Sequence, residues 1–190
     1  MQNNDEYLSK QVLVLAGGGI DSSVCVQMLR RENCLVRTLH VNYGQKSSDL
    51  EWASVKKISQ FYCCSSSQVN ITGLNFIKKK EIIGRNAALI FLGLMNIKQD
   101  ESGLCIGIHK GTGFYDCSTL FYEQVSRLVQ EYTDASVSLL APLLSFSKPE
   151  IIAYAKLISL PFDLTYSCQN GILGGCGKCH SCLDRERFGC

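Results

Sequence analysis

The feature that most constrains this chain is a turn of three glycines at residues 17–19. The turn is preceded by the apolar run Val12-Leu13-Val14-Leu15, which has the length and composition of a buried strand. After the turn, apolar residues recur at helical spacing between Ser23 and Arg31. The chain is therefore expected to pass from a strand directly into a helix, as in the units from which parallel α/β sheets are built.

The residues of this turn are suited to binding phosphate. Glycines leave backbone N–H groups unshielded, and the N-terminus of the following helix adds partial positive charge. Hydroxyl groups add further donors, whereas Asp21 makes sense if a Mg²⁺ lies between its carboxylate and the phosphate oxygens. An ordinary tight turn of small residues is the alternative. The predicted nucleotide-binding segment, here called the glycine loop, comprises Leu15, Ala16, Gly17, Gly18, Gly19, Ile20, Asp21, Ser22 and Ser23.

Strand and helix patterns alternate along the rest of the chain. We expect strands at 11–16, 34–41, 68–71, 104–108 and 137–140, and helices at 20–33, 47–61, 86–97, 119–131 and 147–157. The helix at 86–97 is so apolar that we expect it to be buried on most sides. Ser118 and Ser147 should cap the last two helices, and Glu150 completes a capping box with Ser147. The pattern predicts an α/β fold with a doubly wound parallel five-stranded sheet.

Ligands of such a sheet bind at the carboxyl ends of its strands. The glycine loop, the turn at 42–45, the loop at 109–117 and the helix start at 147 all fall at this edge. We expect one α/β domain over residues 1–163, with residues 164–190 packed on it as a small subdomain held by a metal.

Four cysteines near the C-terminus have the spacing of a metal site. They are Cys168, Cys176, Cys179 and Cys182, in the pattern C-x7-C-x2-C-x2-C. Four thiolates complete a tetrahedron around zinc and leave no open position, so we expect a structural Zn²⁺. An iron–sulfur cluster is the alternative. His180 lies within the cluster and is expected not to be a ligand.

The bulk composition excludes several classes of protein. The chain has 190 residues and a net charge of +2, which gives no argument for a broad nucleic-acid or membrane surface. Its polar, acidic start is unlike a signal peptide, so a cytoplasmic location is expected and the 11 cysteines need not form disulfides. The run Lys78-Lys79-Lys80 is expected to be a solvated face, with contact to ATP phosphates or RNA as the alternative.

Several short motifs, in order over residues 11–188, resemble those of one family. They are the loop at 17–22, which is similar to the SGGxDS loop of N-type ATP pyrophosphatases; Tyr43-Gly44-Gln45; Gly84-Arg85-Asn86; Tyr115-Asp116-Cys117; Ala141-Pro142-Leu143; Ser147-Lys148-Pro149-Glu150-Ile151; and Thr165-Tyr166-Ser167-Cys168 with the CGKCxxC tail and Arg185. The chain resembles the 7-cyano-7-deazaguanine synthase (QueC) family.

This resemblance implies an adenine nucleotide α-hydrolase-like fold and an ATP-dependent carbon–nitrogen ligase of queuosine biosynthesis. The family adenylates the carboxylate of 7-carboxy-7-deazaguanine with ATP, and ammonia then displaces AMP to give the amide. A second ATP activates the amide oxygen, and loss of AMP leaves the nitrile. The resemblance also implies a homodimer.

Roles for individual residues follow from the same resemblance. Catalytic roles are expected for Asp21, which would hold Mg²⁺, for Lys148, which would hold the departing pyrophosphate, and for Arg85. Lys148 could equally be a surface charge. Substrate binding is expected at Tyr43, Gln45, Arg85, Asn86, Tyr115 and Asp116.

Two of these assignments have structural alternatives. Arg85 and Asn86 carry donors suited to a carboxylate or a purine-like edge, but they could also serve only to start a helix. Tyr115 could stack on a deazaguanine while Asp116 accepts from its N–H groups, but the pair could also serve only to anchor a loop.

Differences from the family keep other activities open. Gly17 stands where the family has its first Ser, Ile82-Ile83 replace Val-Pro, and the chain is shorter around 73–83. One alternative is a QueC-like antiviral defence enzyme with a protein partner, which joins the acid to another amine or stops at the amide. A second is a tRNA-thiolation ATP pyrophosphatase that uses Cys117, and a third is a nucleotide-binding partner protein without catalysis.

Overall fold

A computed structural model describes residues 10–74 and 82–190 of the chain. The predicted run of lysines at 78–80 lies outside these residues. The helices and strands are β1 (Gln11–Leu15), α1 (Ile20–Arg31), β2 (Leu35–Asn42), α2 (Ser48–Phe61), β3 (Ser65–Asn70), α3 (Arg85–Met95), β4 (Gly103–Ile106), α4 (Thr119–Tyr132), β5 (Ser138–Leu140), α5 (Lys148–Leu157) and α6 (His180–Phe188), with 3₁₀ turns η1 (Tyr115–Cys117) and η2 (Phe162–Leu164).

The strands form one parallel five-stranded sheet in the order β3-β2-β1-β4-β5. The chain builds outward from β1 to β2 and β3, and then returns to the other side of β1 for β4 and β5. In α/β sheets of this kind, ligands bind beside such a reversal, which here lies at the carboxyl ends of β1 and β4. The predicted fold class is confirmed.

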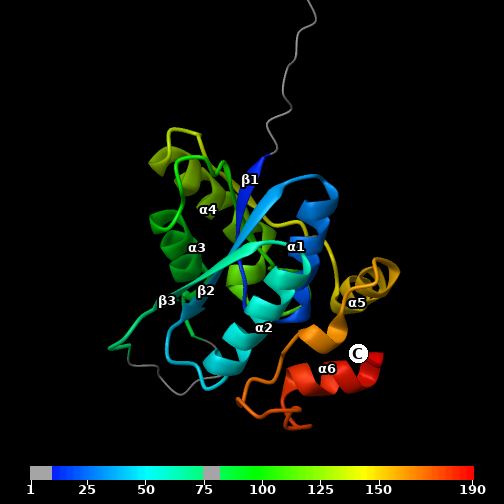
Figure 1. The fold of residues 1–190 in the computed structure, drawn as a ribbon. Coiled ribbons are helices and arrows are strands. Elements are labelled where there is room, and N and C mark those ends of the chain that lie inside the picture. The colour runs from blue at the N-terminus through cyan, green and yellow to red at the C-terminus, as the bar shows by residue number, and fades with distance from the viewer. Residues whose placement is uncertain (1–9, 75–81) are drawn as a thin grey trace, which may run out of the picture.

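Helices cover both faces of the sheet. Alternate residues of β1 point to opposite faces, as the two-residue period of a strand requires. Val12 and Val14 belong to a core shared with α1 and α5, whereas Leu13 and Leu15 belong to a core shared with α3 and α4. Figure 1 shows α3 and α4 on one side of the sheet and α1, α2 and α5 on the other.

Two predicted helix caps are confirmed. The side chain of Ser118 accepts a hydrogen bond of 3.1 Å from the N–H of Phe121 at the start of α4. At α5, the backbone N–H and the hydroxyl of Ser147 both donate to the Glu150 carboxylate, at 2.7 and 2.6 Å. These caps fix where the loops from β4 and β5 enter their helices, at the carboxyl edge of the sheet.

Three predictions about the elements need correction. The third strand begins at Ser65 rather than at 68, because β3 is an edge strand that pairs with β2 through polar residues. The helix near 86–97 is not buried on most sides: Met95 is 81% exposed, and its buried residues are Asn86, Ile90 and Gly93. The helix α6 within the cysteine-rich segment was not predicted, because metal-ligand spacing hid its helical pattern.

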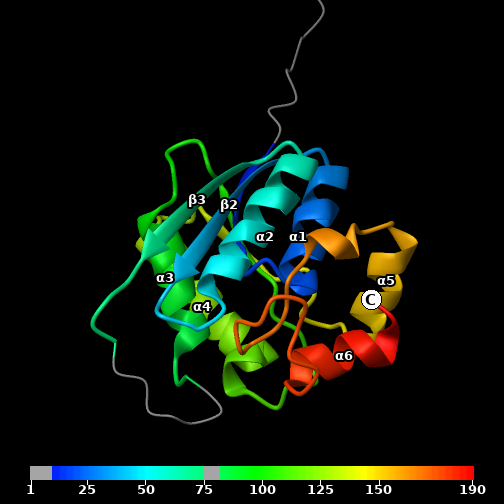
Figure 2. The same cartoon turned by 60° about the horizontal axis from the view of Figure 1, so that its bottom comes forward.

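The segment after α5 runs back beneath the carboxyl edge of the sheet. Figure 2 brings this side forward and shows the orange and red C-terminal segment beside α1, α2 and α5. The division into domains at 163/164 remains a prediction. Among the described residues, no helix has the length and apolar character needed to cross a membrane.

Candidate functional site

The glycine loop connects β1 to α1 at the carboxyl edge, with Gly19 as the N-cap of the helix. The carbonyl groups of the loop are held from behind: the hydroxyl of Ser54 donates to Gly18 at 2.9 Å, and that of Ser23 donates to Gly19 at 2.8 Å. In the described part of the chain, no group accepts a hydrogen bond from the N–H of Gly17, Gly18 or Gly19. The loop therefore presents free donors at a helix N-terminus, which is an arrangement suited to an anion.

Any residue other than glycine at position 18 would strain the backbone of the loop. The φ of Gly18 is +70°, and a Cβ at this position would lie 2.6 Å from the carbonyl oxygen of Glu51 and 2.9 Å from the Cβ of Ser54. Glycine is the residue that adopts this conformation freely and allows α2 to approach so closely. In contrast, a Cβ on Gly17 would meet nothing within 4 Å.

Part of the predicted nucleotide-binding segment is buried. Leu15, Ala16, Ile20 and Ser23 are each less than 9% exposed, whereas Asp21, Ser22, Gly17 and Gly19 reach the surface. The buried members hold the loop in place rather than offering contacts of their own. Ser22 also donates to the Gly19 carbonyl, at 3.2 Å.

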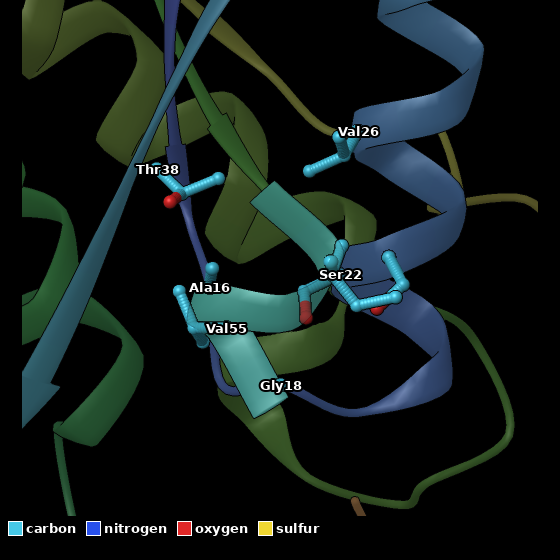
Figure 3. A pocket seen from close by; sticks show the side chains of 8 residues that line it. Ala16, Gly18, Ser22, Val26, Thr38 and Val55 are labelled. Carbon is cyan, nitrogen blue, oxygen red and sulfur yellow. The ribbon is translucent and has the colours of Figure 1, made fainter. Parts of the chain in front are cut away.

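Behind the loop is a narrow gap between α1, α2 and the sheet. Figure 3 shows Ala16 and Gly18 of the loop, Thr38 of β2, Val26 of α1 and Val55 of α2 around it. The gap leaves no room for a water molecule. It is a feature of the packing that supports the loop and is too narrow to hold a ligand.

Asp21 lies between two basic side chains. Its Oδ1 is 2.6 Å from Nζ of Lys148, and its Oδ2 is 3.6 Å from Nε2 of His109. Asp21 belongs to the first turn of α1, Lys148 to the first turn of α5, and His109 to the loop after β4. Three segments far apart in sequence therefore meet at the mouth of the glycine loop, and the predicted pair of Asp21 and Lys148 is brought together.

The approach of β4 to α1 depends on Gly107. A Cβ on this residue would lie 3.2 Å from the N atom of Ser22 and 3.3 Å from the carbonyl carbon of Asp21. Because residue 107 is a glycine, the chain after β4 can pass close to the first turn of α1. His109, two residues later, therefore lies near the carboxylate of Asp21.

Tyr43 and Arg85 form a second group at the same edge. Tyr43 follows β2, Arg85 begins α3, and their side chains are hydrogen-bonded to each other. Burial raises the pKa of the Tyr43 hydroxyl, while the charge of Arg85 acts in the opposite direction. The Arg85 side chain is exposed, so its guanidinium remains accessible to an anionic ligand.

Asn86 and Asp116 are buried and bind each other. The backbone N–H of Asn86 donates to Oδ2 of Asp116 at 3.2 Å, and its side chain donates to the Asp116 carbonyl at 3.1 Å. This pair joins the start of α3 to η1. Tyr115 is exposed, donates to Gln124 at 2.5 Å and packs edgewise on Phe121. These contacts match the loop-anchor alternative as well as they match substrate binding.

Gln45 shapes the turn after β2. Its side chain accepts from the N–H of Tyr43 at 2.9 Å, and donates to the Val41 carbonyl at 3.1 Å and to Glu51 at 2.9 Å. All three contacts are internal, and their effect is to hold Tyr43 at the edge of the sheet.

The four predicted cysteines converge. The sulfur atoms of Cys168, Cys176, Cys179 and Cys182 all lie within 4.8 Å of one another, and those of Cys176 and Cys182 are 3.9 Å apart. Cys168 is buried and the other three are half-buried. His180 is 85% exposed in its side chain and pairs with Asp184, outside this set.

The thiol of Cys176 is surrounded by hydrogen-bond donors. The backbone N–H groups of Lys178 and Cys179 point at its sulfur from 3.5 and 3.3 Å, and the Asn170 amide points at it from 3.3 Å. Because these donors stabilise the thiolate, they lower the pKa of Cys176 to about 6. The resulting thiolate is the form that binds a metal.

The cysteine-rich segment contacts the glycine loop and the turn after β2. The N–H of Tyr166 donates to the Gly18 carbonyl at 2.8 Å. Gly171 lies so close to Lys46 that a Cβ would be 2.2 Å from the Lys46 carbonyl oxygen. Arg185 of α6 holds this segment through the hydroxyls of Thr165 and Ser167. The cysteine cluster is therefore connected to the glycine loop through the backbone.

Two of these contributors were not identified as site residues from the sequence. His109 carries no local signal beyond its place after a strand, and Ser54 lies on α2 with no motif around it. Their roles depend on which segments the fold brings together. The position of a strand end at the carboxyl edge was the one clue that could have singled out His109.

Cys117, the residue that a thiolase would use, is half-buried beside Asn86 and Asp116. Burial raises the pKa of its thiol, and the charge of Asp116 acts in the same direction. A raised pKa disfavours the thiolate that sulfur-transfer chemistry requires.

Sequence comparisons place these features in one family. The profile described as "Queuosine biosynthesis protein QueC" matches residues 11–90 and 77–188. A 7-cyano-7-deazaguanine synthase from Campylobacter jejuni subsp. jejuni serotype O:2 is 27% identical over 209 residues, covering 95% of this chain and 93% of the relative. The 7-cyano-7-deazaguanine synthase 2 of Rhodopseudomonas palustris is 29% identical over 206 residues, covering 93% and 95%.

Solved structures with the same fold belong to proteins with other activities. The U34-tRNA thiolase NcsA from Methanococcus maripaludis, with its [4Fe-4S] cluster, has a TM-score of 0.60 at 17% identity; the match covers 97% of this chain and 66% of that one. An NH3-dependent NAD synthetase from Campylobacter jejuni has a TM-score of 0.50 at 16% identity, with 86% and 72% covered. At these identities the likeness is one of fold alone.

Proposed function

The chain belongs to the QueC family of queuosine biosynthesis proteins, and on that premise we propose that it is an ATP-dependent 7-cyano-7-deazaguanine synthase. Relatives with that name align with more than nine-tenths of this chain. The observation that carries the proposal is the glycine loop, whose N–H groups find no acceptor among the described residues and whose Asp21 pairs with Lys148.

The proposed reaction begins with activation of a carboxylate. An oxygen of 7-carboxy-7-deazaguanine attacks the α-phosphorus of ATP, and the bond to the β-phosphate breaks to release pyrophosphate. The N–H groups of the glycine loop and the ammonium of Lys148 would bind the phosphates and stabilise the charge that collects on the pyrophosphate. Asp21 would hold Mg²⁺, which neutralises phosphate charge when it is bound.

Ammonia then attacks the acyl carbon and displaces AMP with loss of a proton, which gives the amide. In a second round the amide oxygen attacks the α-phosphorus of ATP and pyrophosphate leaves. Departure of AMP with the former amide oxygen, and loss of both protons from the nitrogen, then gives the nitrile. Arg85, with Tyr43 beside it, would hold the acid, because Arg85 offers an exposed, charged planar donor at the same edge as the loop. Asn86 and Asp116 would support them by fixing the start of α3.

The four cysteines fit a single tetrahedral zinc ion. Zinc–thiolate bonds of about 2.3 Å place the sulfur atoms about 3.8 Å apart, which agrees with the 3.9 Å between Cys176 and Cys182. An iron–sulfur cluster is wider than one ion and would need its thiolates further apart. The donor set and its buried member Cys168 therefore favour structural zinc.

One experiment tests the proposed function. The protein is incubated with 7-carboxy-7-deazaguanine, Mg·ATP and ammonia, and the products are identified by mass spectrometry. We expect 7-cyano-7-deazaguanine, with two AMP released for each nitrile, and no product from the Asp21→Ala variant. Accumulation of the amide alone would contradict a complete synthase, and bound ATP without release of AMP would indicate a non-catalytic partner protein.

The homodimer implied by the family is a separate proposal. Light scattering after gel filtration measures the mass in solution, and a value near twice the 21.0 kDa of one chain is expected. A monomer that remains fully active would contradict a requirement for the dimer.

A further inference from the structure

The helix α3 is apolar on every side, yet one of its sides faces solvent. Residues 86–97 contain no charged side chain. The inner side of the helix packs on the sheet through Ile90, whereas on the outer side Ala88 is exposed and Met95 is 81% exposed. A helix that is apolar all round is ordinarily buried. The outer side of α3 therefore has the composition of a buried surface, and nothing in the described part of this chain covers it.

The neighbouring helix α4 continues this apolar surface. The ring of Phe91 on α3 packs edge to face on the ring of Tyr132 on α4, with centroids 5.8 Å apart. Tyr132 is nonetheless 75% exposed, and Leu128, one turn before it, is 42% exposed. Figure 1 shows the two helices on the same face of the sheet. The exposed apolar surface that spans both helices, here called the α3–α4 patch, consists of Phe91, Met95, Leu128 and Tyr132.

Two opposite charges border the patch on α4. Arg127 and Glu131 are exposed and lie one turn apart, on either side of Leu128 in the sequence. Among the described residues, neither side chain finds a partner for an ion pair. An exposed apolar patch with a polar rim is typical of a protein–protein interaction site.

The arrangement of these charges is complementary to itself. In a contact about a two-fold axis, residue i of one copy meets residue j of the other, and j meets i. Arg127 of each copy can therefore meet Glu131 of the other, which gives two ion pairs from one pair of residues. A partner with a single sign of charge would attract only one of the two side chains and repel the other.

From these observations we propose that the α3–α4 patch is the surface through which two copies of this chain associate. Met95 and Tyr132 would lie at the centre of the contact, with Arg127 and Glu131 at its rim, which is the usual distribution of apolar and charged groups in an interface. The inference rests on the homodimer proposed above, to which it gives a location, and it is independent of the reaction at the glycine loop.

The first test places a charge at the centre of the patch. Light scattering after gel filtration, over a range of protein concentrations, measures the dissociation constant of the pair. We expect Met95→Glu to raise this constant on the order of a hundredfold, because the contact would bury two unpaired carboxylates. Leu157→Glu is the matched control, since Leu157 is 78% exposed on α5 at the other face of the sheet. Its dissociation constant should equal that of the unsubstituted protein, and circular dichroism should show that both variants are folded.

The second test asks whether the charges pair between copies. Arg127→Glu leaves two acidic groups beside the patch, and Glu131→Arg leaves two basic groups. Each variant alone should associate about tenfold more weakly, because like charges would then meet. An equimolar mixture of the two restores opposite charges at both contacts and should recover the dissociation constant of the unsubstituted protein. Charges that pair only within one chain would not respond to mixing.

Three results would overturn the inference: normal association of Met95→Glu, a mixture that associates no better than its components, or an unsubstituted protein that is a monomer at every concentration. The proposed reaction is assayed separately, through nitrile formation by the unsubstituted protein, so none of these results decides it. A dimer that depends on Met95 but makes no nitrile would support the inference and contradict the proposed function.

Discussion

The backbone N–H of Tyr166 donates a hydrogen bond of 2.8 Å to the carbonyl oxygen of Gly18. Tyr166 lies two residues before Cys168, the buried member of the cysteine cluster. The Gly18 carbonyl also accepts from Ser54, whose hydroxyl lies 2.6 Å from the Leu164 carbonyl as well. The glycine loop is therefore held between α2 and the segment that the metal would hold.

This connection predicts that loss of the metal weakens nucleotide binding. Cys176→Ser should lose zinc, because three thiolates and a hydroxyl bind zinc more weakly than four thiolates. The melting temperature should fall, and the affinity for Mg·ATP should fall on the order of tenfold, as the loss of about one hydrogen bond to the loop implies. Metal analysis, calorimetry and thermal melting measure these changes. Cys63→Ser is the matched control, since Cys63 is exposed and lies outside the cluster. Normal ATP affinity in zinc-free protein would contradict the connection.

A second prediction concerns the backbone of the loop. Gly18→Ala should destabilise the protein by about 1–3 kcal/mol, because alanine at φ +70° is strained and its Cβ would meet the Glu51 carbonyl at 2.6 Å. Gly17→Ala should change the free energy of unfolding by less than about 0.5 kcal/mol, because its Cβ would meet nothing. Urea titration of both variants measures the difference. Equal stabilities would show that α2 yields to the extra methyl group.

The order of elements and the edge that carries the site followed from sequence patterns. The apolar runs that form β1 and β4 are buried on both faces of the sheet. A continuous apolar run of this kind is the strongest signal in the sequence for a strand of a parallel sheet. The caps at Ser118 and Ser147 were predictable because capping depends on residues three apart, so no distant contact is needed. The four cysteines were predictable because metal ligation fixes residue types and spacing.

Other features depended on contacts between distant segments. The polar start of β3 at Ser65 has no strand pattern in the sequence. It becomes a strand because its backbone pairs with Arg37 and the residues that follow in β2. The exposed side of α3 carries apolar residues such as Met95, so hydrophobicity alone overstated its burial. The meeting of His109 with Asp21 joins residues 88 positions apart, and no local pattern encodes such a contact.

A third prediction separates charge from shape at Asp21. Asp21→Asn keeps the volume of the side chain but removes the charge that would hold Mg²⁺. We expect AMP release to fall about a hundredfold or more. The free energy of unfolding should change by less than about 1 kcal/mol, because the pair with Lys148 is partly exposed to water. Unchanged AMP release would rule out a metal role for this carboxylate.

A fourth prediction uses the pKa of about 6 at Cys176. In protein freed of metal by a chelator, this thiol is mostly thiolate at pH 7, and the thiolate fraction falls as the pH drops below 6. Iodoacetamide should therefore alkylate Cys176 before Cys182, whose pKa burial raises to about 11. Peptide mass spectrometry over pH 5 to 8 should give a half-maximal rate for Cys176 near pH 6. A rate that still rises tenfold for each pH step above 7 would show that the surrounding N–H groups do not stabilise the thiolate.

A fifth prediction concerns stability away from the site. Arg37 and Glu101 form a partly buried ion pair near the amino ends of β2 and β4, with Nε–Oε1 at 2.6 Å and a second contact, Nη2–Oε2, at 2.7 Å. Glu101 also accepts from the N–H of Lys98 at 2.9 Å. Glu101→Gln removes the counter-charge of a guanidinium that is only 12% exposed, so we expect a loss of about 1–3 kcal/mol in the free energy of unfolding.

The matched control for this pair is Glu123→Gln, because Glu123 is exposed on α4 and its replacement should cost less than about 0.5 kcal/mol. Urea titration measures both variants. Because the pair lies at the edge of the sheet opposite the glycine loop, the Glu101 variant should keep its Mg·ATP affinity under conditions where it is folded. Equal stabilities of the two variants would mean that Arg37 is held by the Asn96 carbonyl and Ser67 without need of the carboxylate.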